Sequence, residues 1–215
     1  MREEILRKKK KVDKNLFKKI GHRSIGLTGY SFVNYINKNE LKETNNLLNN
    51  KLKRYLQSNF SNYDYYFHND IGINLYTSWH KDRLNNNWHG FYRNYEKYSP
   101  WSDNNYNIYK CLIYLQDHSN SSSLNVIPFS HKDKNINTSN QEVLYTNIGD
   151  IIIFDQRLKH KGNNKDKFIK RIIKSFIEDK NIILITVGFG NKYSKHLEEF
   201  KKGTLIRQNR VDFIN

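Results

Sequence analysis

Cysteine, proline and long apolar runs are scarce in this chain, and each shortage excludes a class of protein. The single cysteine, Cys111, rules out an internal disulfide, and its place in a β-prone segment indicates a reducing compartment. No apolar stretch is long enough to span a membrane, and the charged residues 1–14 do not form a secretory signal. Only two prolines and ten glycines interrupt the 215 residues, without repeats. These absences predict a soluble, cytoplasmic protein with one domain over residues 1–215.

Basic residues, in contrast, are abundant. Lysine and arginine number 37 against 21 acidic residues, which gives a formal net charge of +16. Such a field would attract nucleic acid, anionic lipid or a phosphorylated small molecule, but Lys, Asn, Ile and Tyr are abundant throughout the chain, so a compositional bias is the preferred explanation. The basic N-terminal segment, residues 1–25, is typical of a mobile, solvated terminus. A second excess of basic residues runs from Lys159 to Lys174 and favours an anionic small-molecule substrate.

Two short segments carry the residue types of a metal site. His80 and Asp82 are two residues apart, and in a strand that spacing points both side chains to the same face. The preceding segment, residues 74–79, is β-prone. His160 follows a Gly-Asp turn and the apolar run Ile151–Phe154. Two imidazoles and one carboxylate on one side of an ion leave its other positions open, which is typical of non-heme Fe(II) oxygenases.

Four sequence blocks extend this pattern. They are WHKD (79–82), KCLIYLQD (110–117), SLNVIPFSHK (123–132) and GDIIIFDQRLKHKG (149–162). In the order and content of these blocks the chain resembles the phytanoyl-CoA dioxygenase family of Fe(II)/2-oxoglutarate-dependent oxygenases, over roughly residues 70 to 190. One departure is Phe129, where the family usually has glycine.

The resemblance implies a fold, a cofactor set and a reaction. The fold would be an all-β core with flanking helices, a double-stranded β-helix or jelly roll. His80, Asp82 and His160 would hold Fe(II), to which the co-substrate 2-oxoglutarate and O2 bind, and the product would be a hydroxylated C–H bond. Related halogenases have a small residue where Asp82 stands, so its carboxylate favours hydroxylation. Tyr76 shares a face with His80 in a regular strand and would donate a hydrogen bond to 2-oxoglutarate.

Two basic residues are candidates to bind the distal carboxylate of 2-oxoglutarate. Arg171 lies eleven residues past His160, a spacing that resembles the family's, and its guanidinium suits a carboxylate. The helical period of the apolar residues between 168 and 177 nevertheless places Arg171 on an amphipathic helix. Lys180 stands just before the predicted strand 181–187, where a family member with such a helix would carry its basic residue. Both residues therefore remain candidates for binding the distal carboxylate.

The segment 83–106 has no sustained period and directly follows the metal pair, so it is interpreted as a lid or substrate wall. Its candidate substrate contacts are Trp88, His89, Tyr92, Arg93 and Trp101. The alternative is that these aromatic residues only anchor the loop to the barrel. His131 is expected to border the pocket, and Arg157 to contact either the substrate or Asp155.

Two other functions fit parts of the sequence. An oxygenase acting on nucleic acid or another macromolecule would use the positive charge, although the arginine-rich pattern of nucleic-acid demethylases is not visible. A non-catalytic β-helix binding protein is disfavoured because all three metal ligands are present. Outside the barrel, Leu41, Leu48, Leu52 and Tyr55 predict one face of a helix that Asn37 would cap and that would pack outside the sheet.

Overall fold

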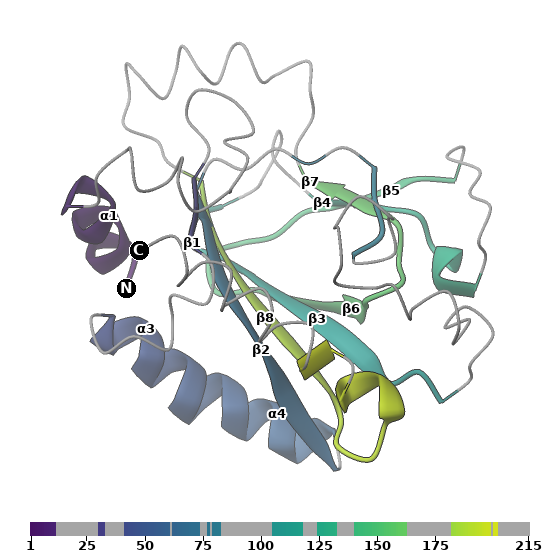
Figure 1. Ribbon diagram of the computed structural model, residues 1–215. Helices are drawn as coiled ribbons and strands as arrows, with labels where there is room; N and C mark the ends of the chain where they lie inside the picture. The colour runs from purple at the N-terminus through teal and green to yellow at the C-terminus, as the bar shows by residue number, and fades with distance from the viewer. Residues whose placement is uncertain are drawn as a thin grey trace, which may run out of the picture.

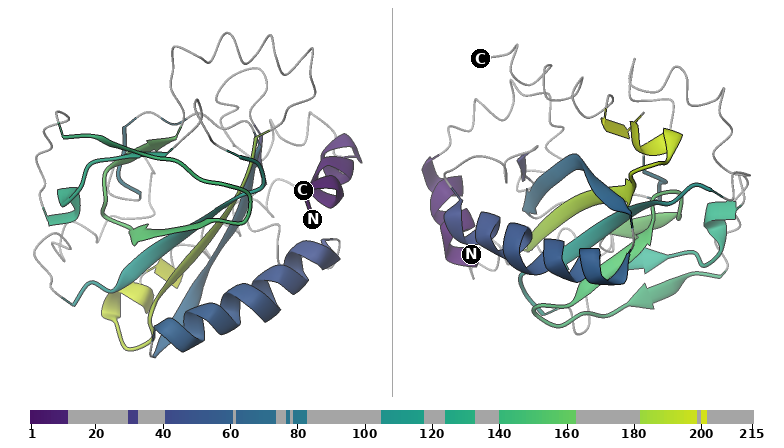
Figure 2. Two further views of the ribbon diagram at one scale, coloured as in Figure 1. Left: turned by 180° about the vertical axis from the view of Figure 1, so that it is seen from behind. Right: turned by 90° about the horizontal axis from the view of Figure 1, so that it is seen from below.

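The strands of the molecule form two antiparallel sheets. The computed structural model describes residues 1–11, 30–32, 41–60, 62–73, 77, 79–82, 105–117, 124–132, 140–162, 182–198 and 200–201. The larger sheet has the order β1 (Tyr30–Phe32), β2 (Tyr63–Ile73), β8 (Ile183–Asn191), β3 (Ile108–Tyr114) and β6 (Ile151–Asp155). The smaller sheet has the order β5 (Glu142–Leu144), β4 (Leu124–Val126) and β7 (His160–Gly162). Figures 1 and 2 show the two sheets as separate layers.

Both faces of the larger sheet are covered, and the alternation of residues along its strands explains how. On β8, Ile183, Ile185 and Val187 belong to the core cluster shared with the helices. Leu184, between them, belongs to the cluster that the two sheets enclose. Because successive residues of a strand point to opposite faces, β8 separates two hydrophobic layers. The jelly-roll prediction with flanking helices is confirmed, as is the strand predicted after Lys180.

The inner layer lies between the sheets. It consists of Leu112, Tyr114, Leu124, Val126 and Phe154, with Leu144, Ile152, Leu158 and Leu184 packed around them. These residues come from β3, β4, β5, β6 and β8 and, for Leu158, from the turn between β6 and β7, so side chains from both sheets form this core. Cys111, on the opposite face of β3, is fully buried toward the helices, and burial raises its thiol pKa to about 12.

Helices cover the outer face of the larger sheet. Residues 42–59 form one continuous helix made of α3 (Lys42–Asn46), a π-helical turn (Leu47–Leu52) and α4 (Lys53–Asn59), which runs along the sheet in Figure 1. Leu41, Leu48, Leu52 and Leu56 are buried against it, whereas Tyr55 is 51% exposed. The predicted apolar face is therefore right except for Tyr55. Among the described residues, no helix has the length and apolar character to cross a membrane.

The start of α3 is held by another helix and not by a local cap. The N–H groups of Glu43 and Thr44 donate to the Glu4 carboxylate at 3.1 and 3.2 Å, and the Thr44 hydroxyl donates to it at 3.0 Å. Glu4 lies on α1 (Arg2–Lys11), within the segment predicted as a basic terminus. A carboxylate is favoured at a helix N-terminus because the first amides lack intrahelical partners. The prediction that Asn37 caps this helix is wrong, since the helix begins at Lys42.

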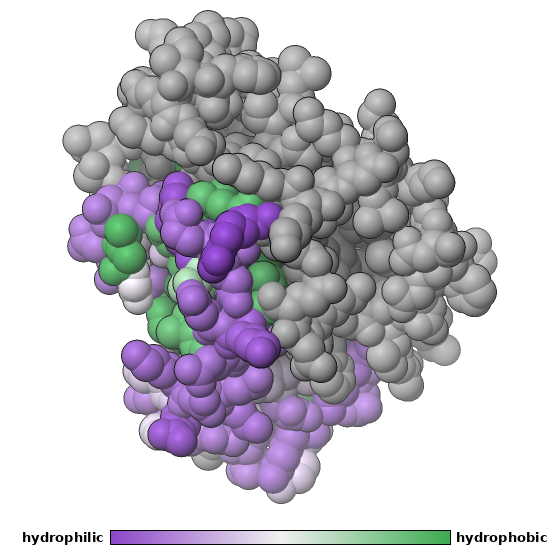
Figure 3. Space-filling model, turned by 90° about the vertical axis from the view of Figure 1, so that its left-hand side faces the viewer, coloured by the Kyte–Doolittle hydropathy of each residue, from purple (hydrophilic) through white to green (hydrophobic). Residues whose placement is uncertain are grey.

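The surface over α1 and the start of α3 is mainly hydrophilic. Figure 3 shows this side of the molecule, where hydrophobic areas are small and lie among hydrophilic groups. Ile5 of α1 is 1% exposed and packs in the core with the helix and the sheet. The N-terminal helix is thus part of the folded core.

Phe129 adopts a backbone conformation that favours glycine. Its φ is 60°, and its side chain is 77% exposed. We expect Phe129→Gly to raise the free energy of unfolding by about 1 kcal/mol, because the left-handed conformation costs a non-glycine residue about 1–2 kcal/mol. Substitution by glycine removes this backbone strain but costs about 0.5–1 kcal/mol, because glycine has greater conformational freedom in the unfolded chain. Urea unfolding measures the change.

The matched control for this substitution is Asn62→Gly. Asn62 has a φ of 55°, but asparagine tolerates this region, so a smaller gain is expected there. A loss of stability in Phe129→Gly would show that the exposed ring makes contacts that outweigh the backbone strain.

Candidate metal centre

The two histidines meet through their backbones. The N–H of His80 donates to the carbonyl of His160 at 3.0 Å, and the N–H of His160 donates to the carbonyl of His80 at 2.9 Å. Directly opposed residues of an antiparallel pair place their side chains on the same face. The imidazole centroids accordingly lie 4.3 Å apart.

A bulge adjoins this pair. The N–H of Thr77 donates to the carbonyl of Gly162 at 3.3 Å, and the N–H of Gly162 donates to Thr77 Oγ1 at 2.7 Å. Thr77 and His80 are three residues apart, whereas Gly162 and His160, which lie opposite them, are two residues apart. The first segment therefore has one extra residue. An extra residue on one strand changes which side chains face inward, and such bulges are frequent beside active sites.

Asp82 completes the group. Its Oδ1 lies 3.4 Å from Nε2 of His80 and its Oδ2 lies 3.7 Å from Nε2 of His160. His80, Asp82 and His160 each offer one ligand atom, and these three atoms lie within 4.8 Å of one another. Two ligand atoms at right angles on one ion, each about 2.1 Å from it, are about 3.0 Å apart. The three side chains predicted as metal ligands are thus brought together by the fold.

His160 presents a neutral imidazole with its lone pair toward the site. Its Nδ1 is 2.9 Å from the carbonyl of Leu158, which can only accept, so Nδ1 carries the proton and Nε2 does not. The side chain is 3% exposed, and the ring of Phe154 packs on it at 4.8 Å. Burial lowers the pKa of His160 to about 3, against the opposite effect of Asp82. At neutral pH no proton need be displaced from Nε2.

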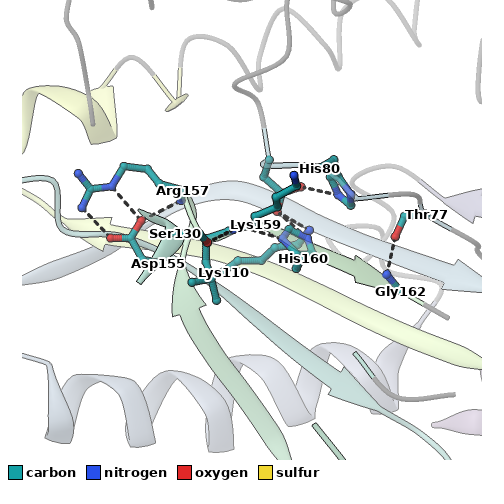
Figure 4. A network of polar contacts seen from close by, with 11 residues as sticks. Thr77, His80, Lys110, Ser130, Asp155, Arg157, Lys159, His160 and Gly162 are labelled. Atoms are coloured by element: carbon teal, nitrogen blue, oxygen red, sulfur yellow. Dashed lines mark hydrogen bonds and ion pairs between the residues drawn. The ribbon is translucent and has the colours of Figure 1, made fainter. Parts of the chain in front are cut away.

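Asp82 is ionised in the same setting. Burial alone would raise its pKa, but the ammonium of Lys110 and the two imidazoles outweigh burial and hold the pKa well below the usual value. Nζ of Lys110 lies 2.6 Å from Asp82 Oδ2, and both side chains are 12% exposed. Figure 4 shows His80, Lys110 and His160 around this point. Two imidazole nitrogens and one carboxylate are the donor set that suits Fe(II) with open positions.

Ser130 ties the two ligand-bearing segments together. Lys81, which lies between the ligands His80 and Asp82 and is 5% exposed, donates from Nζ to the carbonyl of Ser130. The N–H of Lys159, beside His160, donates to Ser130 Oγ at 2.8 Å. The hydroxyl itself donates to the carbonyl of Ile127 at 2.6 Å. One buried serine therefore contacts residues adjacent to all three ligands.

We expect Ser130→Ala to weaken both the fold and the metal centre. The substitution leaves the N–H of Lys159 without its acceptor, which costs about 1–3 kcal/mol where the group is buried. Loss of a group that orients ligands typically lowers metal affinity about 10- to 100-fold. Urea unfolding and competition with a chelating dye measure the two effects.

Ser194→Ala is the matched control, because Ser194 Oγ accepts a hydrogen bond from the N–H of His196, at 3.2 Å, in the segment after β8, which carries none of the three ligands. It should change stability without changing metal affinity. If Ser130→Ala behaves in the same way, Ser130 has no role in positioning the ligands.

The other predicted residues that the structure describes lie near the centre but not in it. Arg157 donates to both carboxylate oxygens of Asp155, at 3.0 and 2.8 Å, and its guanidinium lies 4.1 Å from the ring centroid of Tyr106. Figure 4 shows this pair as a group distinct from the histidines. His131 lies in the 3-10 turn Ser130–Lys132, and burial lowers its pKa. Arg157 therefore has the predicted structural partner.

The remaining predicted residues lie outside the described residues. They are Tyr76, Trp88, His89, Tyr92, Arg93, Trp101, Arg171 and Lys180. Two lysines at the centre, Lys110 and Lys81, were not predicted from the sequence. The available signal was a lysine inside the otherwise apolar strand 108–115, since a buried ammonium needs a charged or polar partner.

Comparison with known proteins identifies the fold. No protein-family model and no curated protein matches the chain. HygX from Streptomyces hygroscopicus, solved with nickel and 2-oxoglutarate bound, is 11% identical with a TM-score of 0.54, over 89% of this chain and 77% of that chain. HygX with hygromycin B bound as well gives a TM-score of 0.50 at 11% identity, over 77% and 70%. EvdMO1 is 17% identical with a TM-score of 0.52, over 75% of this chain but only 35% of that one. These structures share the fold of the chain whose metal centre has just been described.

Proposed function

We propose that this chain is an Fe(II)/2-oxoglutarate-dependent oxygenase that hydroxylates a C–H bond of a small molecule. The observation that carries the proposal is the convergence of His80, Asp82 and His160, with Nε2 of His160 unprotonated and Asp82 ionised. Nickel and 2-oxoglutarate bound to HygX, a protein of the same fold, support the cofactor set.

Each residue of the centre has a definite part in this function. His80, Asp82 and His160 would hold Fe(II), which with 2-oxoglutarate supplies the activation of O2 needed to oxidise an unactivated C–H bond. The carbonyl of Leu158 fixes the orientation of the His160 ring, and Phe154 packs against that ring and shields it from water. Asp82 would take a coordination position that a halide would need, so we expect hydroxylation and not halogenation.

The finer assignment is to the phytanoyl-CoA dioxygenase family. In its support, the described parts of the four sequence blocks form neighbouring elements of one centre: the His80–Asp82 segment, β3, the β4 turn with Ser130, and β6 with β7. Ser130 contacts residues beside the ligands, so three of these blocks take part in holding the ligand-bearing segments together.

An anionic small molecule is the proposed substrate class. Lys159 and Lys161 flank His160, and Nζ of Lys161 lies 4.8 Å from the ring centroid of Trp79, which itself precedes His80. Basic and aromatic groups beside the ligands suit an anionic, partly apolar compound. HygX has hygromycin B bound in one structure, which supports small molecules as substrates of this fold.

The test is binding and turnover of 2-oxoglutarate by the full chain. Under anaerobic conditions with Fe(II), one equivalent of 2-oxoglutarate should bind, and a chelator should abolish binding. Admission of O2 should then form succinate slowly even without substrate. Binding that is independent of metal, or no binding at all, would exclude the proposed function.

A further inference from the structure

Lys110 is a buried cation beside the metal ligands. It lies on β3 opposite Phe154 of β6 and opposite Gly188 of β8. It shares parity with Leu112 and Tyr114, whose side chains lie in the layer between the two sheets, so its side chain points inward as well. Its Nζ is 2.6 Å from Oδ2 of Asp82, the oxygen that faces His160.

A bound metal ion changes what this ammonium can do. With Asp82 Oδ2 coordinating a dication, the Lys110 ammonium would stand beside a second, larger positive charge. Asp82 carries only one negative charge between these two positive groups, so a second anion beside the ion would stabilise them further. The flexible four-carbon stem of lysine lets Nζ turn from Asp82 to such an anion without movement of β3.

The net charge of the centre indicates how many negative charges the bound anion should carry. Fe(II) would contribute two positive charges, Lys110 contributes one positive and Asp82 one negative charge, and imidazole bound to a metal ion contributes none. The sum over the ion, its three ligands and the ammonium in contact with Asp82 is two positive charges, which matches the dianion 2-oxoglutarate. Without Lys110 the centre would carry one positive charge, which suits a monoanion.

We propose that Lys110 binds the distal carboxylate of 2-oxoglutarate, an inference that rests on the proposed function. Gly188 leaves the register position opposite Lys110 without a side chain. Thr186 is 7% exposed, faces Leu112 across the same pair of strands, and is therefore a diagonal neighbour of Lys110 on the inner face. Its hydroxyl supplies a second donor for the same carboxylate.

The test compares two ligands in the nickel-loaded protein by calorimetry. 2-Oxopentanoate has the carbon chain of 2-oxoglutarate without the distal carboxylate. In Lys110→Met, 2-oxoglutarate should bind at least about tenfold and up to about a hundredfold more weakly, while the affinity for 2-oxopentanoate should stay as in the wild type. Both ligands are measured in the nickel-loaded protein, so the readout is the ratio of the two affinities, which a change in nickel affinity alone does not alter. A merely structural Lys110 would lower nickel affinity and the affinity for both ligands together.

Further variants make the result independent of one substitution. Lys110→Gln repeats the measurement with a polar side chain, and Thr186→Val should weaken 2-oxoglutarate binding to a smaller extent. Lys51→Met is the control, because Lys51 is exposed on the outer helix. Arg171→Ala and Lys180→Ala are measured beside them.

The outcomes separate the two proposals. Wild-type affinity for 2-oxoglutarate, within about threefold, in Lys110→Met would overturn the anchor while leaving the oxygenase intact. A selective loss of 2-oxoglutarate binding in Arg171→Ala or Lys180→Ala, with none in Lys110→Met, would assign the anchor to that residue. Failure of the wild-type protein to bind 2-oxoglutarate with metal would overturn both the anchor and the proposed function.

Discussion

In His160→Ala, stoichiometric metal binding and 2-oxoglutarate turnover are both expected to fall to background. The substitution removes the ligand whose Nε2 is kept unprotonated by the bond from Nδ1 to Leu158. Because loss of a group that merely orients a ligand costs about 10- to 100-fold in metal affinity, loss of the ligand itself should cost more. Competition with a chelating dye measures affinity, and succinate formation measures turnover.

A buried histidine outside the centre controls for damage to the fold. His196 is 2% exposed and its ring lies 4.9 Å from that of Tyr106, so His196→Gln should keep its metal stoichiometry even where stability falls. Full metal occupancy with normal turnover in His160→Ala would remove His160 from the ligand set.

Asp82→Ala should abolish metal binding and also destabilise the metal-free protein. The variant leaves the Lys110 ammonium, 12% exposed, without the carboxylate at 2.6 Å. Breaking a buried ion pair by removing one partner costs about 3–5 kcal/mol, and the residual exposure of this pair favours the lower figure. Urea unfolding in the presence of a chelator measures the loss.

The double variant Asp82→Ala with Lys110→Met separates the two effects. Removing the orphaned ammonium as well should recover most of the stability, since an apolar pair of similar volume is often tolerated in place of ions. Metal binding should stay absent. If the single variant were as stable as the wild type, the Asp82–Lys110 pair would contribute little to the fold, and the charge balance that assigns Lys110 to 2-oxoglutarate would lose its main support.

The ligand set could be predicted from the sequence because it depends on local chemistry. His80 and Asp82 are two residues apart, His160 follows the apolar run Ile151–Phe154, and the four sequence blocks around them distinguish this pattern from a chance His-x-Asp. Lys110 could not be paired with Asp82 in the same way. Their contact depends on β3 lying beside β8 and β6, and this register is a property of the whole sheet.

Two irregularities of the backbone account for the other differences. The π-helical turn Leu47–Leu52 adds a residue per turn, so the buried face continues at Leu56 and leaves Tyr55 outside. The step from Thr77 to His80 departs from the regular alternation of a strand, and Tyr76, which was predicted to point inward, lies outside the described residues. Neither feature has a reliable sequence signature, because each is decided by the partner against which the segment packs.

Because His80 and His160 pair through their backbones, a metal ion bound to both side chains would also stabilise the fold. An ion held by both side chains would act as a removable cross-link between segments far apart in the chain, in a protein whose lone Cys111 cannot form one. Closing such a loop restricts the unfolded chain as a disulfide does, but reversibly and in proportion to metal activity. At a free metal concentration a hundred times the dissociation constant, the folded state gains about 2.7 kcal/mol. Hydrogen exchange at the amides of His80 and His160 would then report metal supply, and metal supply would set the lifetime of the folded protein.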